Sequence, residues 1–303
     1  MTTIKTPNLT WLDIKEPSPK ELKYLADNYN LHPLILEELK GPTVRSSVEE
    51  HNGCIYAVMH FPVYNPTRQV SEPVEIDFIL TPDTLISARY ESIEPLEEFI
   101  KKCRPASSST RKNILNKSSV YLFYHLVKEL YDFSHRQLDH IEEKISDVES
   151  AIFSGREKEM LLTLSFLRSD IINFLRALRP QNAVLESLTA RADMFETKAR
   201  PYLTDLLGEH NRVINKAESL RETVEGLQST NESLLNHKTN EIMKVLTIIT
   251  FVALPLSLIA NIFGMSSPKI PLVGRPYFFW MIISTMFVTA GAFLLIFKRK
   301  KWL

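Results

Sequence analysis

Hydrogen-bonding side chains recur every seven residues between positions 226 and 264 of this 303-residue sequence. Such a repeat places its positions on one seam of a helix, where the helices of a left-handed bundle meet. Apolar side chains fill this seam in a soluble coiled coil, whereas most of the residues here are small or polar, so several copies would enclose a wet axis. We call these residues the polar seam: Gly226, Ser229, Ser233, Asn236, Asn240, Met243, Thr247, Thr250, Leu254, Ser257, Asn261 and Gly264.

A simpler interpretation exists for the hydroxyls of the polar seam. Thr247, Thr250 and Ser257 can donate back to a carbonyl one turn earlier, or hold two helices together. That interpretation is the better one for any single residue. The number of polar or small residues on one seam nevertheless favours a pore.

The sequence gives no support to an enzyme. It contains no glycine-rich phosphate loop, no His-Glu-x-x-His motif and no nucleophile elbow. Its two cysteines, Cys54 and Cys103, match no metal or disulfide pattern, which fits a reducing compartment. The 36 basic and 36 acidic residues balance, so nucleic acid is not an expected partner.

The polar seam lies on a predicted helix that enters a membrane. Residues 197–241 form a polar stalk, and residues 242–263 are apolar or hydroxyl-bearing apart from Lys244. About 20 such residues, rising about 1.5 Å each, span a hydrocarbon core of about 30 Å. A second uncharged span covers residues 277–297 and precedes the basic tail 298–303, which favours cytoplasmic N- and C-termini. The outer loop would then be residues 264–276, and the chain would be a multi-pass protein of the inner (plasma) membrane.

The sequence before the stalk divides into two predicted cytoplasmic regions. Residues 1–104 form an α/β domain, with strands at 10–14, 54–62, 75–80 and 84–88 and helices at 19–29, 34–40 and 94–102. Residues 105–196 form a helical region that opens with a polar linker, 105–113. Its helices cover 119–153, 157–178 and a stretch ending near 195. Capping-box spacing opens a helix at Ser18 and another at Ser154.

Several motifs in order along the chain resemble the CorA-type magnesium/cobalt transporter family. These are Leu31-His-Pro-Leu-Ile-Leu-Glu-Glu-Leu39, Pro201-Tyr-Leu-Thr-Asp205, Asn240-Glu-Ile-Met-Lys-Val-Leu-Thr, Pro255-Leu-Ser, Gly264-Met265 and the terminal Lys-Lys-Trp-Leu. The resemblance implies an α+β cytoplasmic domain, a stalk helix continuous with the first span, and a homopentameric funnel whose pore is lined by that span. It also implies that divalent ions bridging subunits hold the pore shut, through acids that match Glu38 and Asp205.

The resemblance gives the residues of the ion pathway individual roles. Asn240 would form a polar ring at the cytoplasmic mouth, and Ser257 a hydroxyl ring deeper in the membrane. Met243, Leu246 and Leu254 would form an apolar constriction that gates by dewetting. Gly264 and Met265 would begin the outer filter. Glu38 has an alternative interpretation, as an ordinary solvated carboxylate at a helix end.

This chain departs from the family at the filter. The family has Gly-Met-Asn, whereas this sequence has Gly-Met-Ser with Ser266, whose shorter side chain leaves a wider and less polar ring. The outer loop has no acid but carries Lys269 and Arg275, which oppose capture of a cation. Asn261, one turn inside the filter, is the candidate to supply the missing amide ring.

The predicted function is therefore transport of a hydrated divalent cation, Mg²⁺ first, by a homopentamer in contact with membrane lipids. Mg²⁺ loses its water reluctantly, and a seam of amides and hydroxyls suits a hydrated ion. Two alternatives stay open. One is a Zn²⁺, Co²⁺ or Ni²⁺ transporter of the same family, and the other is a non-conducting, membrane-anchored regulatory paralogue.

Overall fold

The computed structural model describes residues 1–105, 108–115, 117–194, 198–264, 277–300 and 302. These residues form two compact units, Met1–Ser229 and Thr230–Leu303, and each is described by itself. The first unit is built on a six-stranded sheet of order β1-β2-β6-β5-β4-β3. Its strands are β1 (Thr2–Lys5), β2 (Thr10–Lys15), β3 (Ser47–His51), β4 (Cys54–Asn65), β5 (Val70–Leu80) and β6 (Thr84–Arg89). All neighbours pair antiparallel except β2 and β6, which are parallel.

Two short helices cover one face of this sheet. They are α1 (Pro19–Tyr29) and α2 (Pro33–Glu38). Leu25 of α1 and Ile35 of α2 are buried against alternate residues of the central strands, such as Tyr56 and Ile86. The capping box predicted at Ser18 is confirmed, because the Ser18 side chain accepts from the Glu21 N–H while the Glu21 side chain accepts from the Ser18 N–H.

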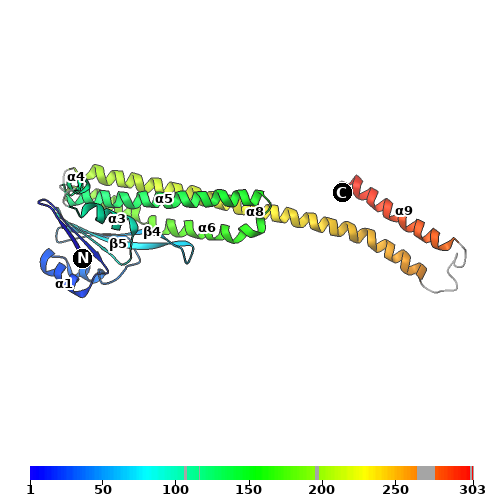
Figure 1. Ribbon diagram of the computed structural model, residues 1–303, viewed down its shortest axis with the longest axis horizontal. Helices are drawn as coiled ribbons and strands as arrows, with labels where there is room; N and C mark the ends of the chain where they lie inside the picture. Colours follow the sequence, from blue (N-terminus) through cyan, green and yellow to red (C-terminus); the bar gives the residue numbers. More distant parts are fainter. Residues whose placement is uncertain (106–107, 116, 195–197, 265–276, 301, 303) are drawn as a thin grey trace. The chain divides into compact units, whose positions relative to one another are not determined.

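The opposite face packs on longer helices (Figure 1). Phe99 of α3 (Glu94–Cys103) meets Trp11 edge to face, with ring centroids 5.8 Å apart. Phe123 of α5 (Ser119–Phe153) meets Phe78 in the same way at 5.0 Å. The helices α6 (Glu157–Leu178) and α7 (Gln181–Ala190) complete this side and are followed by the 3₁₀ turn Ala192–Met194.

Two sequence predictions in the helical region are wrong. The expected linker 105–113 contains the start of α4 (Ser109–Ile114), because Ser108 caps a helix by accepting from the Arg111 N–H at 3.4 Å. The capping box expected at Ser154 is absent. Ser154 instead follows the end of α5 and donates to the carbonyl of Ala151, and Gly155 adopts a left-handed φ of 93° that ends the helix. Strands β1 and β3 were not predicted.

The helix α8 (Ala199–Gly264) is 66 residues long and confirms the predicted helix that continues into an apolar span. The part of α8 that belongs to the first unit has a buried residue at every third or fourth position, packed against the other helices. These residues are Leu203, Leu206, His210, Val213, Ala217, Leu220, Val224 and Leu227. Ion pairs flank this contact, for example Lys216 with Glu142 of α5 at 2.8 Å.

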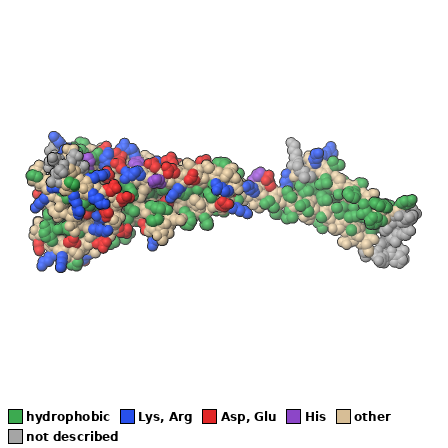
Figure 2. Space-filling view, viewed as in Figure 1, with side chains coloured by type: hydrophobic (Ala, Val, Ile, Leu, Met, Phe, Trp, Pro, Cys, Tyr) green, Lys and Arg blue, Asp and Glu red, His purple; other side chains and the backbone are tan. Residues whose placement is uncertain are grey.

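The second unit contains the end of α8 and the helix α9 (Phe278–Arg299). Both are long and apolar enough to cross a membrane, and almost none of either apolar window is buried within the chain. Figure 2 shows hydrophobic side chains covering these two helices, with lysines and arginines at the C-terminal end of α9. The described residues therefore contain two candidate spans that are not the core of a soluble domain.

Candidate functional site

The polar seam of α8 is centred on a different side of the helix from the ring that contacts α9 in the second unit. Ile248 is buried at 7% exposure, and Phe251 contacts Phe297 of α9 with ring centroids 6.4 Å apart. Because a helix turns about 100° per residue, the seam residues from Thr247 to Asn261 lie roughly 40° to 120° around the axis from Phe251. One chain therefore leaves its polar seam uncovered.

The seam is exposed in one chain, as is most of the apolar part of α8, Phe251 at 55% included. Met243 and Leu254 of the seam are 55% and 64% exposed, and the neighbouring Leu246 is 55% exposed. The polar members Asn240, Thr250, Ser257 and Asn261 are exposed as well, and Thr247 is half-buried. The predicted pathway residues in the described part of α8 thus lie along one accessible side of the helix.

The two threonines of the seam donate hydrogen bonds within α8. Thr247 Oγ1 donates to the Met243 carbonyl at 2.7 Å, and Thr250 Oγ1 donates to the Leu246 carbonyl at 2.9 Å. Thr285 and Thr289 of α9 make the same bond, so it is not peculiar to the seam. Both hydroxyls therefore donate to a carbonyl one turn earlier, as the simpler interpretation expects. Each hydroxyl oxygen can still accept a hydrogen bond from the water shell of an ion.

The filter residues are only partly described. Gly264 is the last residue of α8 and is exposed. Met265, Ser266, Lys269 and Arg275 lie outside the described residues, so the predicted filter and outer loop stay predictions.

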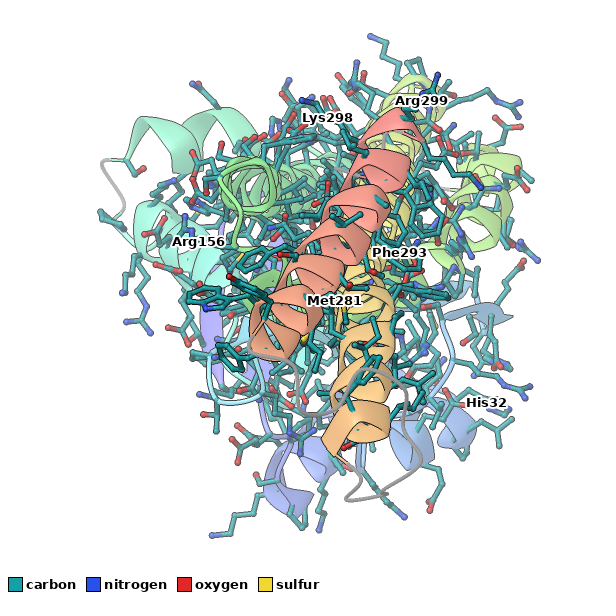
Figure 3. All side chains as sticks on the ribbon, turned by 90° about the vertical axis from the view of Figure 1, so that its right-hand side faces the viewer. His32, Arg156, Met281, Phe293, Lys298 and Arg299 are labelled. Carbon is teal, nitrogen blue, oxygen red and sulfur yellow. The ribbon has the colours of Figure 1, made fainter. Side chains whose placement is uncertain are left out.

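The contact between α8 and α9 is concentrated near the basic end of α9. Phe297 is 8% exposed and packs on Phe251, while Trp302 stacks on Phe297 at 5.9 Å. Figure 3 places Lys298 and Arg299 together at this end of α9, with Met281 toward the other end. Basic residues next to interfacial aromatics are typical of the cytoplasmic edge of a span.

Asp205 sits in a cationic and hydrogen-bonded setting that the sequence did not predict. Its Oδ2 accepts from the Tyr124 hydroxyl at 2.8 Å and from Lys128 Nζ at 3.4 Å. The hydrogen bond from Tyr124, followed by the charge of Lys128, lowers the pKa of Asp205 below its usual value. Tyr124 and Lys128 lie about eighty positions away in the sequence, on α5, so no local motif links them to Asp205.

Glu38 and Asp205 are not brought together within one chain. Glu38 ends α2, on the sheet face covered by α1 and α2, whereas Asp205 contacts α5, which packs on the opposite face. Among the residues that the structure describes, no group of three or more His, Cys, Asp or Glu side chains is placed to hold a metal ion. A metal site that uses both acids therefore needs a second copy of the chain.

The sequence profile of the family described as "CorA-like Mg2+ transporter protein" matches residues 7–299. The chain belongs to this family. Its members are membrane transporters of divalent cations rather than enzymes, and the two apolar helices agree with that class.

Two relatives show how far the similarity extends. The chain is 27% identical to the "Cobalt/magnesium transport protein CorA" of Thermotoga maritima, over 97% of this chain and 83% of that protein. It is 25% identical to the protein of the same name in Methanocaldococcus jannaschii, over 97% and 92%.

Solved structures share the fold from end to end. The complete CorA magnesium transporter of M. jannaschii superposes with a TM-score of 0.86 at 22% identity, covering 100% of this chain and 94% of that one. Full-length CmaX gives a TM-score of 0.75 at 20% identity, covering 98% and 90%. The predicted fold class, an α+β domain followed by long helices and two apolar spans, is confirmed.

Proposed function

We propose that several copies of this chain enclose a path for a hydrated divalent cation, with Mg²⁺ as the preferred ion. The observation that supports this most is the position of the polar seam, which is exposed in one chain and is centred on a side of α8 other than that of Phe251, which contacts α9. A helix that lines a pore needs one side for its own bundle and another, polar side for the axis. The names of the relatives, which mention magnesium and cobalt, support the class of ion.

Residues of the polar seam, together with Leu246, Met265 and Ser266, take successive roles along this path. Asn240 forms the polar ring at the mouth, and Met243, Leu246 and Leu254 form a constriction that can close by dewetting. Thr247, Thr250 and Ser257 offer hydroxyl oxygens to the water shell. Asn261 supplies the amide ring next to Gly264, Met265 and Ser266. Oxygen donors alone suit Mg²⁺, whereas Zn²⁺, Co²⁺ and Ni²⁺ are better held by nitrogen or sulfur.

The assembly is a homopentamer, as the family resemblance implies, in the inner (plasma) membrane. Both termini face the cytoplasm, because Lys298 and Arg299 follow the second span directly. The cytoplasmic regions are then residues 1–104 and 105–196, with the stalk at 197–241. The spans are residues 242–263 and 277–297, joined by the outer loop 264–276, and lipids contact their outer faces.

Regulation by metal would operate between copies. Glu38 of one copy and Asp205 of the next would share an Mg²⁺ ion that holds the pore shut at high cytoplasmic Mg²⁺. The ion must compete with Lys128 for the Asp205 carboxylate, so Lys128 should weaken binding at this site.

Ion flux into proteoliposomes tests the proposal. The native chain and the Ser266→Asn variant would be compared with Mg²⁺, Co²⁺ and Zn²⁺ in parallel, with empty liposomes as the control. Mg²⁺ flux through the native chain is the expected result. Conduction by the Ser266→Asn variant alone would mean that the natural filter excludes Mg²⁺, and no flux through either chain would favour the non-conducting regulatory protein.

A further inference from the structure

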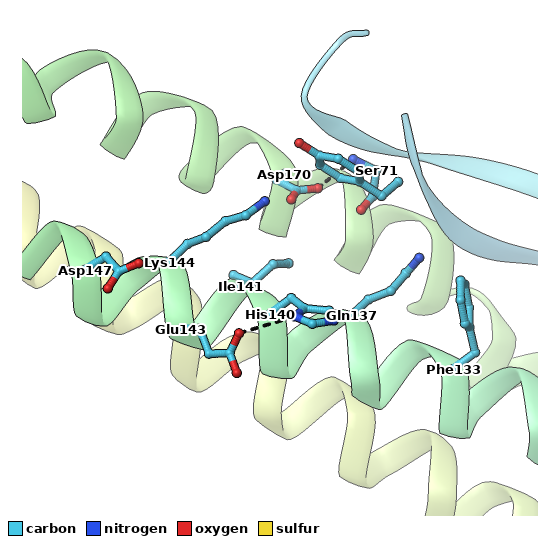
Figure 4. A pocket seen from close by; sticks show the side chains of 10 residues that line it. Ser71, Phe133, Gln137, His140, Ile141, Glu143, Lys144, Asp147 and Asp170 are labelled. Carbon is cyan, nitrogen blue, oxygen red and sulfur yellow. Dashed lines mark hydrogen bonds and ion pairs between the residues drawn. The ribbon is translucent and has the colours of Figure 1, made fainter. Parts of the chain in front are cut away.

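A cavity of about 420 Å³ lies in the first unit, remote from the polar seam in sequence (Figure 4). It is bounded by α5, by α6 and by the ends of β4 and β5. Phe133, Ile141 and Tyr64 form the apolar part of its lining, beside polar and charged side chains. A second cavity of about 350 Å³ adjoins it and shares Tyr64, Lys144 and Asp170. Even without the second cavity, the larger one is in the size range of small-molecule sites.

A buried carboxylate forms the floor of both cavities. Asp170 of α6 is 3% exposed, and its Oδ1 accepts from the backbone N–H of Ser71 at 2.6 Å. Burial raises the pKa of Asp170 despite this bond. Within the described part of the chain, no lysine or arginine comes within ion-pair distance of Asp170, and the charge of Lys144 acts on its pKa only from farther away. A buried carboxylate in such a place is costly unless a positive group joins it.

The wall of the cavity already holds one ammonium group. Lys144 Nζ lies 4.7 Å from the centre of the Tyr64 ring, which is a cation–π contact. The Oε1 atom of Gln137, also in the lining, is buried and has no hydrogen-bond partner among the described residues. An aromatic face and a carboxylate thus border one space, and both attract a positively charged N–H donor.

Charges around the opening favour a cation over an anion. Glu143 and Asp147 line the cavity on the α5 side, with Lys144 between them and His140 paired to Glu143 at 3.3 Å. The lining therefore contains three carboxylates, including that of Asp170, and only one lysine and one histidine. A bare metal ion is a poor fit, because the described residues hold no cluster of three metal-ligating side chains.

We propose that this cavity binds a small organic cation, an ammonium group carried on an aromatic or alkyl body. Asp170 anchors the ammonium, and Tyr64 and Phe133 pack on the apolar body. Such a ligand would contact α5, α6 and the β4–β5 hairpin at once and so brace them. The site does not depend on the proposed transport, and its test involves no ion flux.

The test uses the full-length protein in nanodiscs and tryptamine, which is protonated at neutral pH, as the probe. Hydrogen–deuterium exchange localises binding, because unspecific partition into lipid cannot protect residues 133–147 selectively. The expected result is slower exchange there, with an affinity at least about tenfold weaker in Asp170→Asn, which removes a charge-assisted hydrogen bond. Asp193→Asn, the same change at a residue 78% exposed, is the matched control and should bind like the native chain.

Three results would overturn the proposal. One is equal protection by the neutral analogue tryptophol, which lacks the charge. Another is stronger protection by indole-3-propionate, an anion of similar size, or by Mg²⁺ alone. The third is unchanged affinity in Asp170→Asn. If Asp170→Asn does not fold, Tyr64→Leu decides instead: it removes only the aromatic face and should weaken binding severalfold, and unchanged binding there would equally contradict the site.

Discussion

The two units of the chain differ in how completely they bury their own apolar residues. Up to Ser229, the large side chains of the sheet meet partners in the same chain, as Phe78 meets Phe123 and Trp11 meets Phe99. From Thr230 on, Ile248 and Phe297 are the only buried hydrophobic residues among those described, while Leu254, Phe287 and Val288 are at least 64% exposed. The first unit has a core of its own, whereas the second needs lipid and further copies of the chain.

Truncating one side chain in each unit should expose this difference most clearly. Phe123→Ala removes a fully buried ring and should cost about 3–5 kcal/mol of unfolding free energy. Leu254→Ala, at a position 64% exposed in one chain, should cost less than about 1 kcal/mol. Thermal melts followed by near-ultraviolet circular dichroism would check this, with a drop of roughly 10 °C expected for Phe123→Ala. Similar drops for both variants would mean that the second unit also has a compact core.

Within the second unit, the amide of Asn261 should matter more to flux than the hydroxyl of Ser266. Asn261→Ala should lower Mg²⁺ flux by at least about tenfold, because an amide is lost that contacts a strongly charged ion. Ser266→Ala should lower it by less than about threefold. Initial rates from a fluorescent Mg²⁺ indicator inside proteoliposomes measure both. The reverse order would remove Asn261 from the filter.

In the first unit, Lys128 should weaken the proposed regulatory site. Lys128→Met removes the cation that lies 3.4 Å from Asp205 and leaves a side chain of similar length. Exposed ion pairs contribute about 0.2–1 kcal/mol, so inhibition by cytoplasmic Mg²⁺ should need roughly two- to fivefold less metal. Lys144→Met, which leaves Asp205 untouched, is the control. An unchanged inhibition curve in Lys128→Met would argue against Asp205 as a metal ligand.

The smallest effect is expected for the threonines of the seam. Thr247→Val and Thr250→Val keep the shape of the side chain and remove a hydroxyl that already donates within the helix. Flux should fall by about two- to threefold, in line with the modest energy of hydrogen bonds in membranes. A loss comparable to that of Asn261→Ala would show that these hydroxyls contact the ion directly.

Periodicity predicted the fold well where it is long and uninterrupted. The helix Ser119–Phe153 and the 66-residue helix α8 were both visible as repeats in the sequence. The predictions failed where a few residues determine the local structure, at a helix end and in a short edge strand. Ser154 has the spacing of an N-cap but follows the end of α5, since the left-handed Gly155 comes next. The sequence of strand β3 does not alternate apolar and polar residues, so no buried face can be recognised in it, and the strand forms by pairing with β4.

The candidate site was predictable to the extent that it repeats along one helix. The seven-residue spacing already placed Asn240, Thr247 and Asn261 on one side of α8. The partners of Asp205 were not predictable, because Tyr124 and Lys128 reach it only once α5 and α8 pack together. The cavity around Asp170 likewise joins a helix to two strands about a hundred positions earlier in the sequence, and no sequence motif marks it.

Cysteine cross-linking between copies tests most directly whether the polar seam surrounds a shared axis. Leu254 lies on the seam and Ile248 is the buried hydrophobic residue of this part of α8. The native Cys54 and Cys103 are buried and would be replaced by serine in both the Leu254→Cys and Ile248→Cys variants. After oxidation in membranes, Leu254→Cys should give covalently linked copies on a denaturing, non-reducing gel. Ile248→Cys should run as a single unlinked chain on the same gel. Linked copies from Ile248→Cys alone would place the side of α8 that carries Ile248 at the axis and would contradict the proposed pore.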